Sequence, residues 1–165
     1  MGKEYTVQEA LRLAIRAEKD SLDFYKKAAA VTRNERARKV FRLLAEEEAE
    51  HLKSFLCHYQ GDEFGALSSF AESPPDKSSP GFVALIKAID KDTHEQKALE
   101  IAMQEEKSCI EHYTQFARDI VDPLVRSIFE RVIRETRKHY ELIESEYAQV
   151  MRMVHESDQD IYVRE

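Results

Sequence analysis

Glycine and proline are scarce in this chain: there are four of each among 165 residues, and tryptophan is absent. Tight hairpin turns depend on glycine, so this composition argues against a sheet of many strands. The rest of the chain is rich in helix-forming residues, and 35% of its residues are charged. The composition therefore predicts an all-α protein.

Cysteine and long apolar runs are also lacking. Cys57 and Cys109 form neither a CxxC pair nor a disulfide framework, which suits a reducing compartment. The longest apolar runs, such as "FVALI" at 82–86, fall far short of the roughly 20 residues that a membrane span needs. No signal peptide opens the chain. We therefore expect a cytoplasmic protein without a membrane partner.

Basic residues do not predominate: 25 Lys and Arg stand against 32 Asp and Glu, for a formal net charge of −7. This charge repels nucleic-acid phosphates and anionic lipid head groups unless basic residues are concentrated locally. No run of basic residues stands out in the sequence. Nucleic acid is therefore not an expected partner.

Apolar residues recur with helical periodicity in four long segments. We expect helices over residues 6–31, 36–59, 94–120 and 123–154. The first opens with the capping box "TVQE", and the fourth opens with Asp122 as N-cap and Pro123 at the first helical position. The tail "HESDQDIYVRE" is expected to be frayed or docked on a partner.

The second and third helices are separated by a long connection. Residues 60–81 hold most of the glycine and proline and are predicted to form a crossover loop, followed by a short helix over 82–89. A connection of this length, about 60–93 in all, can travel the length of a helix bundle.

The two halves of the chain resemble each other at an offset of 88 residues. "ALRLAIRAEKDSLDFYKKAA" (10–29) aligns with "ALEIAMQEEKSCIEHYTQFA" (98–117), and the same offset pairs His51 with His139 without a gap. We therefore expect one domain over 1–165: an antiparallel four-helix bundle with a long crossover between helices 2 and 3 and an internal two-fold pseudo-repeat of halves 6–60 and 94–154.

Several polar side chains fall on the apolar stripes of these helices and should point inward. They are Glu18 and Tyr25 on the first helix, Glu48 and His51 on the second, Glu106 and Tyr113 on the third, and His139 on the fourth. The neighbouring Glu46, Glu47 and Glu50 are expected to form a solvated face. Carboxylates gathered in a dry interior repel one another and become protonated unless cations hold them ionised.

A pair of divalent metal ions would remove this cost. A Glu and a His three residues apart lie on one face of a helix, so they can bind the same ion together with a Glu from a facing helix. Ferritin-like diiron proteins use this arrangement, with one Glu from each of two helices and Glu-x-x-His from each of the other two.

At these residues the chain resembles the rubrerythrin branch of the ferritin-like superfamily, especially its small prokaryotic members that carry only the diiron domain. The resemblance covers most of residues 7–154 and rests on "AEKDSLDFY", "LAEEEAEHL", "QEEKSCIEHY" and the register of His139. It implies two iron ions with these ligands: Glu18 and His51 on one ion, Glu106 and His139 on the other, and Glu48 as a bridge. It also implies that Tyr25 and Tyr113 hydrogen-bond ligand carboxylates.

The chain departs from the family pattern at three points. Thr136 stands where a second bridging Glu is expected, although the adjacent Glu135 could swing in as a ligand. Rubrerythrins also carry a carboxylate three residues beyond the helix-three ligand, where this chain has Cys109 counting from Glu106, or Ser108 counting from Glu105. Finally, no paired CxxC motifs mark an electron-delivering rubredoxin domain, so electrons must come from an external donor.

The leading hypothesis from the sequence is a rubrerythrin-like oxidoreductase of the peroxidase or ferroxidase type, in which ferrous iron reduces peroxide or dioxygen, as in defence against oxidative stress. Mn and Zn accept the same ligands and are possible substitutes. A homodimer is expected. Two alternatives stay open: a metal carrier or sensor with a degenerate second site, and a structural four-helix-bundle dimer.

Overall fold

The computed structural model describes residues 4–87, 89 and 95–162, and their regular structure consists of helices without strands. This confirms the all-α prediction. The helices are α1 (Val7–Val31), α2 (Glu35–Leu56), α3 (Leu67–Glu72), α4 (Pro80–Lys87), α5 (Glu95–Arg118) and α6 (Pro123–Tyr162). The predicted helix start at residue 94 lies outside the described residues.

Polar caps begin the first and last helices, as the sequence predicts. The Thr6 amide donates to the Glu9 carboxylate at 2.9 Å, and the Glu9 amide donates to the Thr6 hydroxyl at 3.2 Å. Asp122 accepts from the amides of Leu124 and Val125 at 2.9 and 3.2 Å. These bonds satisfy amides that have no partner within the helix, so each helix starts at a defined residue.

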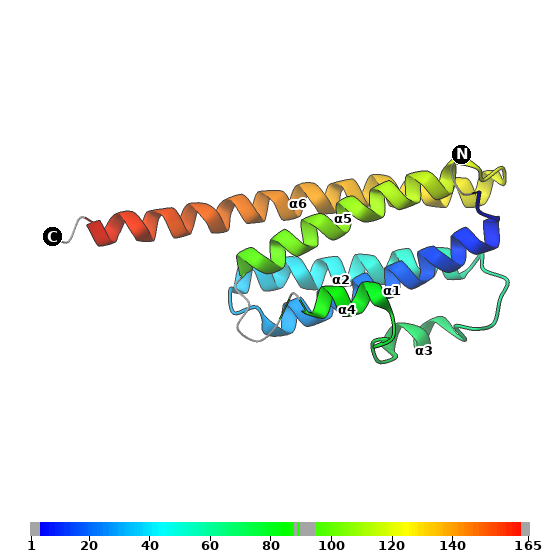
Figure 1. Ribbon diagram of the computed structural model, residues 1–165, viewed down its shortest axis with the longest axis horizontal. Coiled ribbons are helices and arrows are strands. Elements are labelled where there is room, and N and C mark those ends of the chain that lie inside the picture. Colours follow the sequence, from blue (N-terminus) through cyan, green and yellow to red (C-terminus); the bar gives the residue numbers. More distant parts are fainter. Residues whose placement is uncertain (1–3, 88, 90–94, 163–165) are drawn as a thin grey trace.

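The four long helices form two antiparallel hairpins that pack side by side (Figure 1). One hairpin is α1 with α2, and the other is α5 with α6. Between the hairpins, α1 contacts α5 and α2 contacts α6. The space between the helices contains aromatic side chains, such as Phe55 and Phe129 with ring centroids 4.8 Å apart. This packing removes the middle of the bundle from water.

The connection from α2 to α5 contains more helix than the sequence predicts. The segment predicted as a loop over 60–81 includes α3, which contacts α2. The next helix, α4, starts at Pro80 rather than at 82 and packs on α1. The loop prediction was wrong at α3 because a helix of six residues depends on tertiary contacts and leaves little periodic signal.

A buried ion pair ties the connection to α1. The Lys19 ammonium contacts both carboxylate oxygens of Asp23 at 2.7 and 2.6 Å and also donates to the Ser73 carbonyl at 2.9 Å. Both charged side chains are at most 5% exposed. Each charge neutralises the other at a site that excludes water. Removing either residue would therefore leave an uncompensated buried charge.

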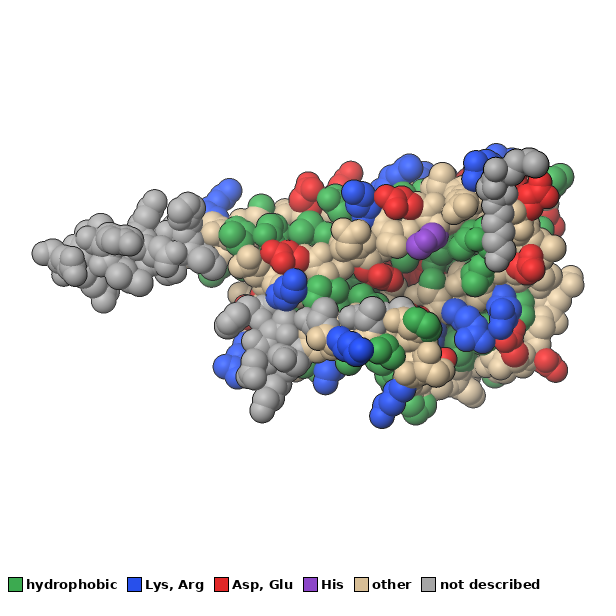
Figure 2. Space-filling model, in the orientation of Figure 1, with side chains coloured by type: hydrophobic (Ala, Val, Ile, Leu, Met, Phe, Trp, Pro, Cys, Tyr) green, Lys and Arg blue, Asp and Glu red, His purple; other side chains and the backbone are tan. Residues whose placement is uncertain are grey.

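The last helix is longer than predicted: α6 does not end near residue 154 but continues to Tyr162, beyond the ends of its neighbours (Figure 1). Within the described residues, no helix combines the length and the apolar character that crossing a bilayer requires. The face drawn in Figure 2 carries acidic and basic side chains interspersed.

Replacing Asp23 by Ala should lower the free energy of unfolding by about 3 kcal/mol, because the substitution leaves the Lys19 ammonium buried without a counter-charge. Urea denaturation of the full chain measures this difference. Glu72→Ala is the matched control, since it removes an exposed partner 4.0 Å from Lys26 and should cost less than about 1 kcal/mol. Equal losses in the two variants would contradict the importance of the buried pair.

Candidate metal centre

The five predicted ligand side chains meet in the middle of the bundle. Glu18 and Glu106 are both 2% exposed, on α1 and α5; Glu48 and His51 on α2 are 3% exposed, and His139 on α6 is 2% exposed. The prediction that these side chains point inward is confirmed. One residue or pair comes from each long helix, so the cluster exists only when both hairpins are packed together.

The cluster divides into two groups that share Glu48. Glu18, Glu48 and His51 form one group, and Glu48, Glu106 and His139 form the other; in each, the three ligand atoms lie within 4.8 Å of one another. Two carboxylates and one imidazole per group suit a divalent transition metal.

Glu48 faces both groups with different oxygens. Its Oε2 lies 3.4 Å from Nδ1 of His51, and its Oε1 lies 3.3 Å from Nδ1 of His139. The same two nitrogens also contact the other carboxylates: Glu18 Oε2 lies 3.5 Å from Nδ1 of His51, and Glu106 Oε1 lies 3.6 Å from Nδ1 of His139. The two rings are stacked, with centroids 5.3 Å apart. This arrangement places a carboxylate between two facing imidazoles.

Three ligand atoms that face the centre are buried without a hydrogen-bond partner, as is Nε2 of His139, which contacts Glu47 as an ion pair. The three are Glu18 Oε2 and the Nδ1 atoms of His51 and His139. Buried polar atoms normally have a partner, because leaving one unsatisfied costs about 1–3 kcal/mol. All three belong to the groups described above and can donate an electron pair to a cation. The residues present therefore fit a pair of metal ions.

Two tyrosines hold the outer carboxylates from the opposite hairpin. The Tyr113 hydroxyl donates to Glu18 Oε1 at 2.6 Å, and the Tyr25 hydroxyl donates to Glu106 Oε1. Both rings are buried in the core. The bond to Tyr113 uses one oxygen of Glu18 and leaves the other, Oε2, facing His51.

Two further carboxylates contact the outer nitrogens of the histidines. Glu135 Oε2 lies 2.9 Å from Nε2 of His51, and Glu47 pairs with Nε2 of His139. A carboxylate on Nε2 favours a proton there and leaves Nδ1 to face the centre. Both carboxylates are partly solvated, with side chains 46% exposed for Glu47 and 40% for Glu135.

These contacts change the roles expected for Glu47 and Glu135. Glu47 was predicted only as part of a solvated face, yet it contacts a buried imidazole. Glu135 was considered a replacement ligand, but the structure places it outside both groups, on the far nitrogen of His51. The sequence did contain a signal, because the offset of 88 residues pairs Glu47 with Glu135.

Thr136 is buried but does not join the cluster. The residue is 2% exposed, and its hydroxyl donates to the Val132 carbonyl at 2.7 Å. A threonine that bonds to the carbonyl four residues earlier turns its oxygen toward its own helix. The position opposite Glu48 therefore supplies no carboxylate.

Burial and mutual contact shift the pKa values of the cluster when no metal is bound. Burial, with the neighbouring Glu48, raises the pKa of Glu18 to about 8. Burial opposes the charged form of both imidazoles, but the nearby carboxylates of Glu18 and Glu48 outweigh it and raise the pKa of His51 to about 12. The carboxylates of Glu106 and Glu48 likewise raise the pKa of His139 to about 10. Near neutral pH, protons on these three side chains thus provide the positive charge that bound metal ions would supply.

Comparison with known proteins identifies the family. The family model described as Rubrerythrin matches residues 9–147 of the chain. The chain belongs to the rubrerythrin family. No curated protein matches it in sequence.

A solved structure shares the fold of this rubrerythrin-family chain. It is a two-domain protein from Anabaena variabilis with DJ-1/ThiJ/PfpI-like and ferritin-like domains, 15% identical in sequence, with a TM-score of 0.68 over 88% of this chain. This chain spans 41% of that protein. The likeness confirms the ferritin-like helical bundle. The match to the Rubrerythrin family model, together with the two carboxylate and histidine groups, supports a diiron-type ferritin-like protein.

One carboxyl group beside the cluster was not identified from the sequence. Burial, with the nearby charge of Asp20, raises the pKa of Glu105 to about 7. Its Oε1 accepts a weak hydrogen bond from the Cys109 thiol at 3.9 Å. Glu105 is therefore an acidic group that contacts Cys109 on the same helix, α5.

Metal binding to this rubrerythrin-family chain should release protons. Glu18, His51 and His139 have raised pKa values in the metal-free protein, so near pH 7 a metal ion must displace protons from all three. The affinity for Zn²⁺ should rise between about pH 6 and 8, by about tenfold per pH unit for each displaced proton. Calorimetry in buffers of different ionisation enthalpy counts the protons, and binding without proton release would contradict the assignment.

Removing Glu47 or Glu135, the carboxylates on Nε2 of the histidines, should weaken the binding of one metal ion more than that of the other. Glu135→Ala leaves His51 without its Nε2 partner, so metal affinity in the group with Glu18 should fall about 10- to 100-fold. Glu47→Ala should do the same for the group with His139. Equilibrium titration with Zn²⁺ measures both affinities. Glu50→Ala is the matched control, because Glu50 is an exposed residue on α2, the helix that carries Glu47. An equal change in the control would contradict a specific role.

Proposed function

We propose that this chain binds two iron ions in its buried cluster and acts as a rubrerythrin-like oxidoreductase in which ferrous iron reduces peroxide or dioxygen. The supporting observation is the pair of groups that share Glu48, with buried ligand atoms that lack any hydrogen-bond partner. Membership of the rubrerythrin family supports the choice of iron.

In this proposal each ligand has a defined role. Glu18 and His51 bind one ion, Glu106 and His139 bind the other, and Glu48 binds both. When bound, two ferrous ions supply the two electrons that, with two protons, convert hydrogen peroxide to two molecules of water. Tyr25 and Tyr113 hold the terminal carboxylates in position, which limits how far they can turn during turnover.

The environment of the cluster supports this chemistry. The aromatic rings of Phe55, Tyr113 and Phe129 pack against one another next to it. A dry, closed surrounding strengthens electrostatic interactions at the centre and limits side reactions with water. The proposal includes an external electron donor that reduces the iron again between turnovers.

A metal carrier or sensor is the second candidate, and Thr136 is the observation that favours it. The two groups contain three carboxylates in all, so three negative charges face the four positive charges of two divalent ions. One ion satisfied by Glu18, Glu48 and His51 would be better neutralised than two. In that case the second position fills weakly and turnover is slow.

Substitutions of single ligands distinguish a centre that holds one ion from a centre that holds two. Because Glu48 is shared, Glu48→Gln should reduce binding of both Fe²⁺ ions, whereas Glu106→Gln should remove only the ion held with His139. Anaerobic iron loading followed by metal analysis should give about two ions in the wild type and about one in Glu106→Gln. Rapid oxidation by peroxide, followed by absorbance, should require the full pair.

The same iron-loading experiment distinguishes a metal carrier or sensor from the oxidoreductase. If the wild type holds about one ion and Thr136→Glu restores a second, the carrier or sensor is supported. Glu50→Gln controls for the loss of a carboxylate elsewhere on α2. A protein that binds no iron after anaerobic loading would contradict both functions.

A further inference from the structure

A groove outside the bundle core lies between the exposed faces of α5 and α6. It encloses about 710 Å³, and four arginines line it: Arg118, Arg126, Arg134 and Arg137. Its apolar lining includes Ala117 and Ile133, which are 7% and 8% exposed. None of these residues belongs to the metal centre. The volume falls within the range of small-molecule sites, about 300–1,000 Å³.

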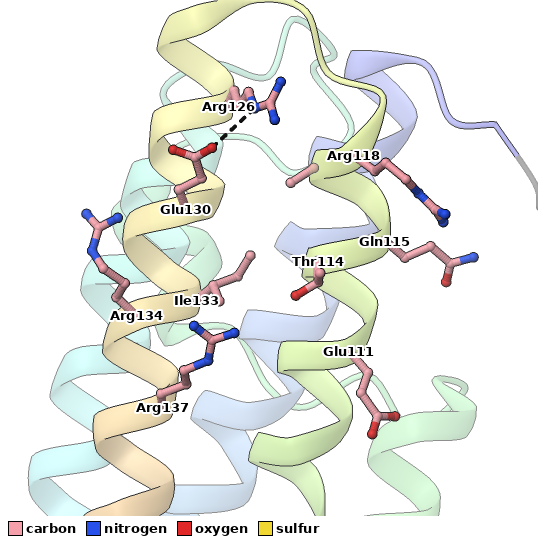
Figure 3. A pocket seen from close by; sticks show the side chains of 10 residues that line it. Glu111, Thr114, Gln115, Arg118, Arg126, Glu130, Ile133, Arg134 and Arg137 are labelled. Atoms are coloured by element: carbon pink, nitrogen blue, oxygen red, sulfur yellow. Dashed lines mark hydrogen bonds and ion pairs between the residues drawn. The ribbon is translucent and has the colours of Figure 1, made fainter.

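Two of the arginines extend into the space between the helices. In Figure 3, Arg126 and Arg137 project from α6 into the groove, and Thr114 faces them from α5. Eleven residues separate the two arginines on α6, which corresponds to about 16 Å along the helix. Ile133 lies between them. The groove thus has a cationic group toward each end and an apolar surface in the middle.

The charge of the groove is only partly neutralised. Arg126 pairs with Glu130 through its Nε atom at 3.2 Å, which leaves its two terminal nitrogens available. Arg118, Arg134 and Arg137 form no ion pair with any residue that the structure describes. Besides the four arginines, the lining contains two carboxylates, Glu111 and Glu130. This positive site stands out on a chain with a net charge of −7.

The chemistry of these groups favours a phosphate. Guanidinium groups bind phosphate oxygens through paired N–H donors, and they lose less hydration than an ammonium in doing so. An apolar surface beside the arginines suits an organic body attached to the phosphate. The sequence showed no basic run because Arg126, Arg134 and Arg137 are spaced along α6 and Arg118 comes from α5. The groove that they line forms only when α5 packs on α6.

We propose that this groove binds an organic phosphate of about nucleotide size. The phosphate contacts Arg137, which unlike Arg126 has no carboxylate partner among the described residues, and the organic body lies over Ile133 and Ala117. The concave shape favours a small molecule over a protein partner, since a stable protein interface needs about 800 Å² of matching surface on each side. The proposal does not depend on the function of the metal centre.

Calorimetric titration of the full chain with ADP tests this site. We expect about one ADP per chain, with affinity that falls as salt is added. Arg137→Glu should weaken ADP binding at least about tenfold, because it replaces a phosphate donor by a repelling charge. Arg131→Glu is the matched control: it makes the same charge change on α6, but Arg131 does not line the groove and instead contacts Ser54. ADP should bind more tightly than inorganic phosphate.

Each other outcome overturns the proposal. An equal loss in Arg137→Glu and Arg131→Glu would show general charge attraction. ADP binding that survives Arg137→Glu would place the nucleotide elsewhere, and inorganic phosphate binding as tightly as ADP would exclude a role for the organic body. Absence of ADP binding, with self-association or capture of an acidic protein that Arg137→Glu abolishes, would make the groove a protein interface instead.

Discussion

The structure depends on the cost of placing carboxylates and imidazoles in the dry middle of a helix bundle. Glu18, Glu48 and Glu106 are nearly inaccessible to water, and an ionised carboxylate there is unfavourable unless a positive charge is close. Without metal, protons on Glu18, His51 and His139 supply that charge, as their raised pKa values indicate. Two metal ions supply it better, because the unpartnered ligand atoms then have a partner.

The same constraint explains why the two halves of the chain exchange contacts. Tyr25 on α1 holds Glu106 on α5, and Tyr113 on α5 holds Glu18 on α1. The outer nitrogens of the histidines are likewise paired across the hairpins, by Glu47 and Glu135. The α1–α2 hairpin supplies Glu18, Glu48 and His51, but the second group combines Glu48 with Glu106 and His139 from the other hairpin. The complete centre therefore forms only when the two hairpins pack, and its formation is coupled to folding of the bundle. The symmetry fails at Glu48 and Thr136, where only one half provides a carboxylate.

Helical periodicity was enough to predict the long helices and the inward direction of the ligands, because a buried stripe constrains every third or fourth residue. Contacts that depend on how helices approach each other were harder to predict. Glu47 lies about 100° round the helix from Glu48, so only the closeness of α6 brings it to His139. The groove between α5 and α6 was also missed, since its arginines are spaced along α6 with one on α5, and its walls exist only when the two helices pack. The length of α6 was missed because no capping signal marks its end.

Crystallography with anomalous scattering at the iron edge, on protein loaded with Fe²⁺ without oxygen, tests the central claim most directly. The account predicts two anomalous peaks inside the bundle, one among Glu18, Glu48 and His51 and the other among Glu48, Glu106 and His139. A map without peaks at these positions, with the carboxylates and imidazoles still bonded only to one another, would contradict it.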